Sequence, residues 1–498
     1  MKSIVQPVLY LACFTSVLLA DDPPAPTMPV SMRTLDLNIG ETQEVVFQNG
    51  KKVTIRLLDL KETRDSLRGA VRQADVTLEV NGQKITLVSA NYRLPISIAE
   101  VRVDCPVTKG YRENSANTVA GDNAWGLDKD VRVRCWPAEG PLLPADTFLY
   151  PAKQRWFASG TQMANEPTHV DGGERASVRK IYYHYGLDIG GAEEHVDVVA
   201  ATNGIVVSAG KAILPGYEKT PAKPRYDVIY LLDERGWYYR YSHLYSIHAA
   251  VKPGAKVKMG QFLGLLGKEG GSGGWSHLHF DITGKQPSGR WGIIDGYAFL
   301  WEAYQRQYQP KIQAVARPHH LAAVGEKVLL DGSRSWSDDG KLAAFEWTFT
   351  DGTKATGEKI ERVYKTPGVY SEVLKIRDGS GRIDYDFAVV NVLDAKDPER
   401  VPPSIHAAYS PTFGIKAGDP VRFFVRSFRT TDGKETWDFG DGSPKADVMS
   451  DGNVVPLAKN GYALTVHRYE KPGHYLARVE RTNRHGYTAI AHVHVRVD

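Results

Sequence analysis

The chain has 498 residues, of which 42% are hydrophobic and 24% charged, a composition typical of a globular protein with three or four domains. Its 62 basic and 58 acidic residues nearly cancel, which leaves a formal net charge of +4. The basic residues form no arm or stripe, so the sequence argues against nucleic acid as a partner.

The first twenty residues have the layout of a secretory signal peptide. One lysine is followed by a short apolar run that ends at Ala20, just before two aspartates. The run is too short and too poorly flanked to cross a membrane as a helix. We expect residues 1–20 to be removed and the mature protein, which has no other run of spanning length, to be exported to the periplasm, the cell envelope or the extracellular space.

Removal of the leader leaves two cysteines, Cys105 and Cys135. Two cysteines in an exported chain are expected to pair as a disulfide. The chain-entropy model gives a loop of about 30 residues a stabilisation of about 3–4 kcal/mol. The alternative is a pair of buried free thiols.

Residues 30–155 are dense in strand and turn signals. The stretches EVVFQNGKKVTIRLL and DVTLEVNGQKITLVSA each hold two β-rich runs around an Asn-Gly pair, at Asn49 and Asn81. Asn-Gly in this setting indicates a hairpin, because both central positions of a type I′ turn need positive φ. We expect a small β domain here, and its sequence contains no recognisable catalytic motif.

The first of three histidine motifs in the middle of the chain is HYGLD, which contains His184 and Asp188. On a straight strand these two residues would lie about 13 Å apart, too far to bind one ion. The β-branched and aromatic neighbours and the glycines argue against a helix. The chain must therefore bend at Gly186, the residue that can turn sharply without steric cost.

The second motif is SHL, within WYYRYSHLYSI. Strand alternation predicts that one face of this segment carries Trp237, Tyr239, Tyr241 and His243.

The third motif is HLHF, which follows the glycine-rich stretch GGSGGWS. A strand would direct His277 and His279 to one face, and Leu278 and Phe280 to the core. Two imidazoles at i and i+2 on one face can approach a single metal ion or substrate.

Together HxGxD, SHL and HLHF resemble, in order, the motifs of the lysostaphin/LytM-type zinc metallopeptidases. The intervening VVAATNGIVVSAG and VKPGAKVKMGQFLGLLG extend the resemblance over residues 156–309. It implies a duplicated hybrid motif fold, with a two-sheet antiparallel β core crossed by a groove. It also implies endopeptidase activity, most often on the cross-bridges or stem peptides of peptidoglycan.

Carried over by motif, the resemblance implies that His184, Asp188 and His279 bind Zn²⁺, and that His277 and His243 form the catalytic pair. Three protein ligands leave one coordination position open, as in catalytic zinc sites. The sequence has no HExxH motif to supply a helical glutamate base, so an imidazole must handle the proton. One histidine of the pair would take the proton and the other would stabilise the oxyanion, and the sequence does not assign these two roles.

The middle region departs from the family pattern at Trp275 and Ser276, where many relatives have a small residue and proline before HLH. We expect this change to alter one wall of the groove. The remaining histidines that we considered are expected at the surface: His195, His248, His319 and His320.

The tail contains a degenerate repeat. FEWTFTDG in the first unit corresponds to ETWDFGDG in the second, and YKTPGVYSEVLKI in the first corresponds to YEKPGHYLARVER in the second. These units resemble PKD domains, the immunoglobulin-like β-sandwiches, over residues 313–396 and 402–498. The resemblance implies spacer or adhesive modules that bind a carbohydrate or protein ligand and take no part in catalysis. Turn chemistry explains the aspartates of the DG turns more simply than calcium binding does.

The sequence thus predicts a mainly β protein with an N-terminal β domain, an antiparallel β peptidase domain and two immunoglobulin-like β-sandwiches. The predicted function is that of an exported zinc endopeptidase whose substrate is peptidoglycan. One alternative is a metalloprotease acting on extracellular proteins. Another is a catalytically silent cell-surface scaffold or adhesion protein, which the retention of all five histidine and aspartate positions disfavours. Since the peptidase motifs end before Arg306, we expect the chemistry to be independent of the sandwiches.

Overall fold

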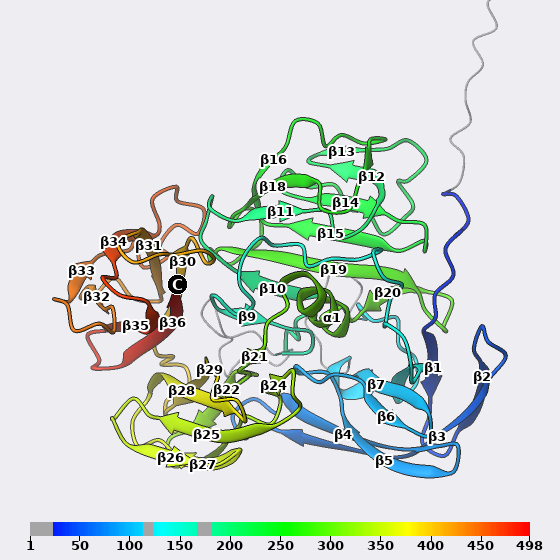
Figure 1. Cartoon of the computed structure of the whole chain (residues 1–498), viewed down its shortest axis with the longest axis horizontal. Helices are drawn as coiled ribbons and strands as arrows, with labels where there is room; N and C mark the ends of the chain where they lie inside the picture. The colour runs from blue at the N-terminus through cyan, green and yellow to red at the C-terminus, as the bar shows by residue number, and fades with distance from the viewer. Residues whose placement is uncertain (1–22, 113–122, 167–180) are drawn as a thin grey trace, which may run out of the picture.

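The computed structural model describes residues 23–112, 123–166 and 181–498, so the predicted signal peptide lies outside the described residues. The regular structure of these residues is almost entirely β-strand, together with the α-helix α1 (Tyr297–Tyr308) and the short 3-10 helix η1 (Lys109–Tyr111). The predicted mainly β architecture is confirmed (Figure 1). Neither helix of the described part has the length and apolar character needed to cross a bilayer.

The N-terminal region forms two four-stranded antiparallel sheets, in the orders β2-β3-β4-β5 and β1-β8-β7-β6. Their inner faces enclose a core rich in valine, leucine and isoleucine. The strands are β1 (Arg33–Leu37), β2 (Thr42–Val46), β3 (Lys52–Arg64), β4 (Val71–Val80), β5 (Gln83–Val88), β6 (Ile96–Ile98), β7 (Val101–Thr108) and β8 (Val131–Pro137).

Both predicted hairpins are present, with different turns. Asn81 and Gly82 have φ of 46° and 82° and join β4 directly to β5, as a two-residue turn with positive φ requires. The first hairpin has a longer loop between β2 and β3, in which Gly50 has positive φ and Asn49 does not. Its ends are closed by the bond from the Phe47 amide to the Lys51 carbonyl.

The predicted disulfide is wrong, because Cys105 and Cys135 are both free, buried thiols. Register on the adjacent strands β7 and β8 explains the result. Cys135 lies opposite Val103, and the pairing is then shifted between Asp104 and Val107. Cys105 is therefore not directly opposite Cys135, and both thiols pack as small apolar groups in the core.

The middle domain, defined here as strands β9–β20, contains a nine-stranded antiparallel sheet with the main order β13-β12-β14-β15-β19-β10-β9. A second sheet has the order β11-β18-β16. The strands are β9 (Thr161–Gln162), β10 (Leu187–Gly190), β11 (Asp197–Val199), β12 (Gly204–Ala209), β13 (Ala212–Ile213), β14 (Ile229–Leu232), β15 (Tyr238–Ser242), β16 (Leu244–Ile247), β17 (Lys256–Val257), β18 (Phe262–Leu266), β19 (His277–Lys285) and β20 (Trp291–Ile294).

One face of β19 packs in the core of this domain. Leu278 and Phe280 are fully buried there, as the alternating pattern predicts, and Phe148 lies between Phe280 and Phe299 of α1. Because side chains alternate along a strand, the other face of β19 presents His277 and His279. The apolar half of the HLHF motif thus anchors the strand that carries its histidines.

The tail forms two sandwiches. The first sandwich, β21–β29, and the second sandwich, β30–β36, share one large sheet because β28 pairs in parallel with β36. The strands are β21 (Ile312–Gln313), β22 (His320–Ala323), β23 (Lys327–Asp331), β24 (Trp336–Ser337), β25 (Leu342–Thr348), β26 (Lys354–Thr356), β27 (Lys359–Val363), β28 (Gly368–Asp378), β29 (Ile383–Leu393), β30 (Ser404–Ser410), β31 (Pro420–Phe428), β32 (Glu435–Asp438), β33 (Ala446–Val448), β34 (Ala463–Arg468), β35 (Gly473–Thr482) and β36 (Thr488–Val497).

The repeated aromatic residues fill the two sandwich cores, as the alternating pattern predicts. Trp347 is fully buried in the first core and Trp437 in the second. The DG aspartates bond within their own turns, since Asp351 accepts from the Thr353 amide and Asp441 from the Ser443 amide. These bonds agree with turn chemistry.

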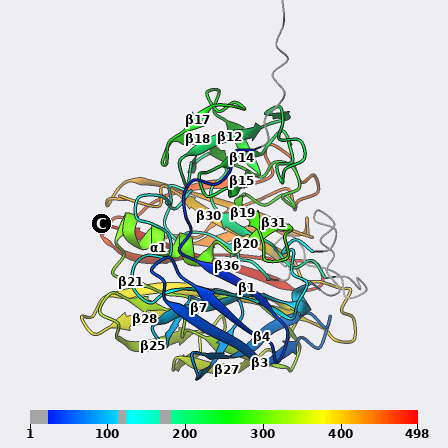
Figure 2. The same cartoon turned by 90° about the vertical axis from the view of Figure 1, so that its right-hand side faces the viewer.

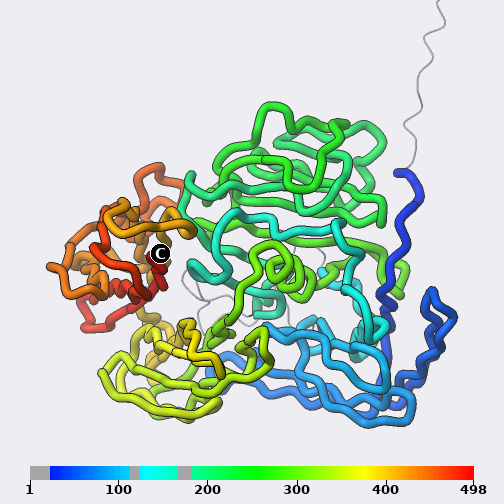
Figure 3. The backbone as a smooth tube through the Cα atoms, viewed as in Figure 1, coloured from blue at the N-terminus to red at the C-terminus, as the bar shows by residue number. Residues whose placement is uncertain are grey.

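The chain folds back so that its last sandwich lies against the middle domain. The tube in Figure 3 shows the orange and red second sandwich beside the green middle domain. In the turned view of Figure 2, β30 lies level with β19. The N-terminal region also touches the middle domain, where the Val71 amide donates to the Tyr183 hydroxyl at 2.7 Å. Regions far apart in sequence therefore pack against the middle domain.

Candidate metal centre and catalytic histidines

The chain bends at Gly186, as the sequence predicts. This residue has φ of +81°, and a Cβ there would lie 2.9 Å from the Phe280 carbonyl oxygen. A side chain would therefore be strained by conformation and would also collide with β19. The bend brings His184 Nε2 to 3.1 Å from Asp188 Oδ1, although four residues separate them.

Strand pairing adds the third group of a compact cluster. Asp188 lies directly opposite His279 between β10 and β19, and His279 Nδ1 is 2.8 Å from Asp188 Oδ1. His184 Nε2 is 3.1 Å from His279 Nδ1. One ligand atom from each residue thus occupies a corner of a nearly equilateral triangle. Among the described residues this is the group of histidine, cysteine and acidic side chains with metal-binding spacing.

The triangle fits a zinc-sized cation. Two imidazole nitrogens and a carboxylate oxygen are ordinary zinc ligands, and bonds of about 2.0–2.2 Å place such ligands roughly 3.5 Å apart. The Asp188 carboxylate is buried, which acts to raise its pKa, but His184, His277 and His279 outweigh this effect and hold the pKa well below its usual value. Asp188 is therefore a buried anion suited to a cation.

A second carboxylate orients His279. Asp281 follows two residues later on the same face of β19, and its Oδ2 lies 3.1 Å from His279 Nε2. Asp281 is opposite Arg240 of β15, which approaches the same oxygen at 3.5 Å. A bond to the outer nitrogen leaves Nδ1 of His279 free to face Asp188, the usual arrangement for a histidine ligand.

His277 approaches the same carboxylate, and within the described part of the chain it is not one of the residues with metal-binding spacing. Its Nε2 is 3.4 Å from Asp188 Oδ2, and its Nδ1 is 3.0 Å from the Trp275 carbonyl. A carbonyl can only accept, so Nδ1 carries the proton and Nε2 keeps its lone pair. Burial lowers the pKa of His277 well below the usual value, more strongly than Asp188 raises it. His277 is thus a neutral imidazole with an unprotonated nitrogen facing the site.

His243 reaches the site through an unusual backbone conformation. It follows the last residue of β15 with φ of +64°. Sequence alternation had placed it on the face of Tyr241, which is in the core, and that prediction is wrong. The left-handed conformation turns the ring to the other face, where its centroid lies 4.6 Å from that of His277.

Two contacts hold His243 in this position. Its amide donates to Asp227 Oδ2 at 3.0 Å, and its Nδ1 donates to the Glu269 carbonyl at 2.6 Å. Burial lowers the pKa of His243, so the ring is neutral and Nε2 is again the nitrogen without the proton. His243 and His277 therefore have the same tautomer and lie side by side, next to the triangle.

Comparisons with known proteins agree with this geometry. Residues 182–289 match the model of peptidase family M23. The chain carries a peptidase family M23 domain. Two further matches are to PKD domains, over residues 308–392 and 405–497. The family resemblance inferred from the motifs is confirmed.

Individual relatives overlap the chain only in part. Collagenase ColA of Clostridium perfringens is 32% identical over 91 residues, which cover 18% of this chain and 8% of the collagenase. A solved structure of Helicobacter pylori Csd3 is 16% identical, with a TM-score of 0.19, and the match covers 54% of this chain and 82% of Csd3. Fibronectin(III)-like modules of Clostridium thermocellum CbhA are 10% identical, with a TM-score of 0.14, over 38% of this chain and 94% of the modules. At these TM-scores neither structure bears on function.

The five residues that sequence analysis assigned to the site all lie together in the M23 domain. Each is between 2% and 6% exposed. They are His184, Asp188, His243, His277 and His279.

The surface prediction for the other histidines is half right. His195 and His248 are exposed. His319 and His320 are partly buried, and burial lowers their pKa to about 3 and about 4. They lie where the first sandwich meets the rest of the protein, so their packing depends on long-range contacts that local sequence does not show.

Sequence reasoning missed the residues that support the M23 site. Asp281 had a readable signal, because it lies two residues after His279 and strand alternation puts both on one face. Asp227 precedes β14 and faces His243, which follows β15 of the same hairpin, so their contact depends on the register of these two paired strands. Sequence reasoning also missed a contact from the second sandwich, in which the Tyr462 hydroxyl accepts from the Ser276 amide at 2.7 Å. The expectation that the chemistry is independent of the sandwiches stays a prediction.

Proposed function

We propose that the chain is an exported zinc-dependent endopeptidase that cleaves peptide cross-links or stem peptides of bacterial peptidoglycan. The observation that carries the proposal is the His184–Asp188–His279 triangle, with edges of 3.1, 2.8 and 3.1 Å, beside a pair of neutral histidines. The M23 domain supports peptidase activity. Zinc, endopeptidase specificity, peptidoglycan and export are parts of the proposal.

The triangle would hold the ion. When bound, zinc would polarise the scissile carbonyl and lower the pKa of water. His184 and His279 would bind through Nε2 and Nδ1, and Asp188 would supply the negative charge. Asp281 fixes the ring of His279 by accepting from its outer nitrogen, so the ligand is oriented before the ion arrives.

His243 and His277 would move the proton. In both rings Nδ1–H donates to a backbone carbonyl, which leaves Nε2 able to accept. The Nε2 of one ring takes a proton from the attacking water and passes it to the amide nitrogen as the peptide bond breaks. The other ring would stabilise the oxyanion only after its own Nε2 has taken up a proton from solvent, because an oxyanion needs an N–H donor. The two rings have matching tautomers, so either can act as the base.

The test is hydrolysis of purified sacculi and of gelatin, with and without a zinc chelator, followed by mass spectrometry of the fragments. Sacculi should release peptides in a chelator-sensitive reaction, and the fragments identify the bond. Cleavage of gelatin alone would replace the peptidoglycan proposal with action on extracellular protein, an outcome worth testing because one relative is named as a collagenase.

Two matched variants distinguish a loss of the candidate site from a histidine substitution at the surface. His184→Ala should abolish the reaction, whereas His248→Ala should not, because His248 is an exposed histidine of the same domain. Hydrolysis of neither substrate by the zinc-loaded wild type would contradict the proposal and favour a silent scaffold. A carbohydrate or protein ligand of the sandwiches stays a prediction.

A further inference from the structure

The glycine-rich loop before His277 is held by the second sandwich. We call residues 270–276, with sequence GGSGGWS, the clamp loop. Three of its backbone groups bond to side chains of the second sandwich. Gly273 and Gly274 accept through their carbonyls, at 2.9 and 2.6 Å, and the Ser276 amide donates at 2.7 Å.

Arg426 of β31 makes the bond to Gly274 and has a fully fixed guanidinium group. The side chain is completely buried, and its other N–H groups donate to both carboxylate oxygens of Asp451 and to the carbonyls of Val455 and Pro456. The Gly274 carbonyl takes the one remaining N–H of the five. Arg426 therefore cannot turn away from the loop without losing bonds inside its own domain.

Asn453 fits the loop tightly. Its Nδ2 donates to the Gly273 carbonyl, and a Cβ on Gly274 would lie 2.0 Å from its Oδ1. Gly274 also has φ of +91°, so any other residue there would be strained as well as crowded. The loop has glycine where the second sandwich approaches it most closely.

Tyr462 connects the loop to a directed chain of hydrogen bonds. Its hydroxyl accepts from the Ser276 amide and donates to His406 Nδ1 at 2.7 Å. His406 Nε2 then donates to Ser159 Oγ at 2.9 Å, and Ser159 donates to the Ala407 carbonyl at 2.7 Å. Burial lowers the pKa of His406 to about 3, so the ring is neutral and can both accept and donate.

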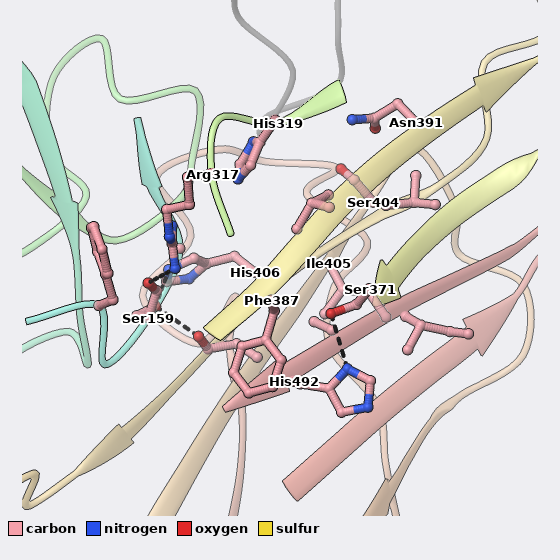
Figure 4. Close-up of a pocket in the computed structure, with 17 residues that line it drawn as sticks. Ser159, Arg317, His319, Ser371, Phe387, Asn391, Ser404, Ile405, His406 and His492 are labelled. Atoms are coloured by element: carbon pink, nitrogen blue, oxygen red, sulfur yellow. Dashed lines mark hydrogen bonds between the residues drawn. The ribbon is translucent and has the colours of Figure 1, made fainter. Parts of the chain in front are cut away.

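His406 lies at the junction of three domains. Figure 4 shows it beside Ser159, at one wall of a cavity of about 70 Å³ that the segment 157–160 and both sandwiches line. Its ring also meets Trp275 edge to face, with centroids 5.3 Å apart. The second sandwich thus contacts the side chain of the clamp loop as well as its backbone.

Trp275 transmits this support to His277. The two rings are stacked, with centroids 3.8 Å apart and planes 19° apart. The Trp275 carbonyl also accepts the Nδ1 proton of His277, which leaves Nε2 facing the site. A shift of the loop would therefore move both the ring and the acceptor that sets its tautomer.

We propose that the second sandwich is a positioning element of the peptidase site. Arg426, Asn453 and Tyr462 hold the clamp loop, and the loop holds His277. This inference rests on the proposed function, and it assigns a positioning role to a domain whose resemblance to PKD domains implied only a spacer or adhesive module. These three are positioning residues, since none of them touches the metal ligands or the reacting atoms.

The test compares full-length variants with a matched control. Tyr462→Phe removes only the hydroxyl, and Asn453→Gly removes the side chain while permitting the φ of +59° found at this position. Tyr469→Phe is the control, because its hydroxyl makes a buried bond to the Phe439 carbonyl within the same sandwich, away from the loop. Dye-labelled sacculi serve as substrate, and the saturating rate, half-saturating concentration and zinc content are measured.

Both clamp variants should lower the saturating rate by about 10- to 100-fold, the scale of a small misplacement of a catalytic group. The half-saturating concentration and the zinc content should stay near the wild-type values, because the ligands are untouched. Tyr469→Phe should keep the wild-type rate. Hydrogen exchange of the 268–276 peptide should quicken in the clamp variants alone, since the Ser276 amide loses its acceptor in Tyr462→Phe.

The experiment distinguishes failure of the proposed function from failure of the positioning role. A wild type inactive on sacculi would overturn the proposed function. An active wild type whose rate is unchanged in the clamp variants, although the loop exchanges faster, would overturn the positioning role alone. An equal loss of rate in Tyr469→Phe would also overturn it, by showing a general effect of a weakened sandwich.

Discussion

His243 lies beside His277, with ring centroids 4.6 Å apart, only because His243 leaves its strand in a left-handed conformation. Ser242, the residue before it, is paired with His279 across β15 and β19. Regular alternation would have turned the next side chain into the core. A non-glycine residue in this conformation costs about 1–3 kcal/mol, and such strain gathers at functional sites.

A substitution at His243 can separate the role of its backbone conformation from the role of its imidazole ring. We expect His243→Asn to lower turnover by about 10²–10⁴-fold, the range for loss of an acid–base group, because asparagine tolerates positive φ but cannot carry the proton. Zinc content should stay near one per chain. The double variant with His277→Ala should lose far less than the product of the two single losses if the rings act as a unit. A fully multiplicative loss would contradict the paired role.

The two histidines of HLHF should differ in their effect on metal. His279→Ala removes one of the three proposed ligands, so zinc content and activity should both fall. His277→Ala should keep near-stoichiometric zinc while turnover falls by about 10²–10⁴-fold. Measuring both the zinc content and the turnover rate of each purified variant shows which of the two histidines binds the metal. Loss of zinc in His277→Ala with retention in His279→Ala would reverse the assignment.

Asp281 should act through His279. Asp281→Asn keeps the shape of the side chain but removes the charge that holds His279 Nε2 at 3.1 Å. We expect zinc affinity to fall by about 10- to 100-fold, the usual effect of removing a partner of a histidine ligand. Competition with a chromogenic chelator measures this affinity without reference to activity. An unchanged affinity would show that Asp281 serves only its contact with Arg240.

Both cysteines should be free and unreactive in the native protein. Burial raises the pKa of Cys105 and of Cys135 to about 12, so neither forms a thiolate at neutral pH. A thiol reagent should label neither residue before denaturation and both after it, without any reductant. The mass of the intact protein reports how many cysteines are labelled. If the denatured mature protein takes up no label, the two cysteines form the disulfide that the sequence predicted.

Stability should fall in mild acid. Burial lowers the pKa of His406 and His492 to about 3, below the 6.5 of an unfolded histidine. The unfolded chain therefore binds protons first, and stability is complete above about pH 6.5 and declines as pH falls toward 3. The thermal midpoint should drop between pH 7 and pH 5. His492→Gln, which also removes a ring bonded to Ser371 at 2.9 Å, should show a weaker dependence on pH than the wild type.

The local part of the site could be predicted from the sequence. Gly186 indicated the bend that joins His184 to Asp188, and alternation through HLHF indicated which residues face the candidate site and which face the core. These inferences succeed because they depend on a few neighbouring residues. The fate of Cys135 could not be read in this way, since the register of β7 against β8 decides which residue it faces.

Relationships that depend on contacts between separate segments could not be predicted from the sequence. The orientation of His243 depends on a backbone conformation that a histidine adopts only when its surroundings impose it, here through Asp227 and Glu269. The contact of Tyr462 with Ser276 joins two domains whose motifs each look complete by themselves. Local patterns carry no information about docking between domains.

The contacts of the clamp loop also fix when the site can be completed during synthesis. Arg426 follows Gly274 by 152 residues, Asn453 follows Gly273 by 180, and Tyr462 follows Ser276 by 186. At about 5–20 residues per second, a chain that emerges N-terminus first makes the last of these residues roughly 10–40 seconds after the loop. The residues of the triangle and of the histidine pair are thus all synthesised before the second sandwich. His277 can therefore reach its final arrangement only after the second sandwich has been made.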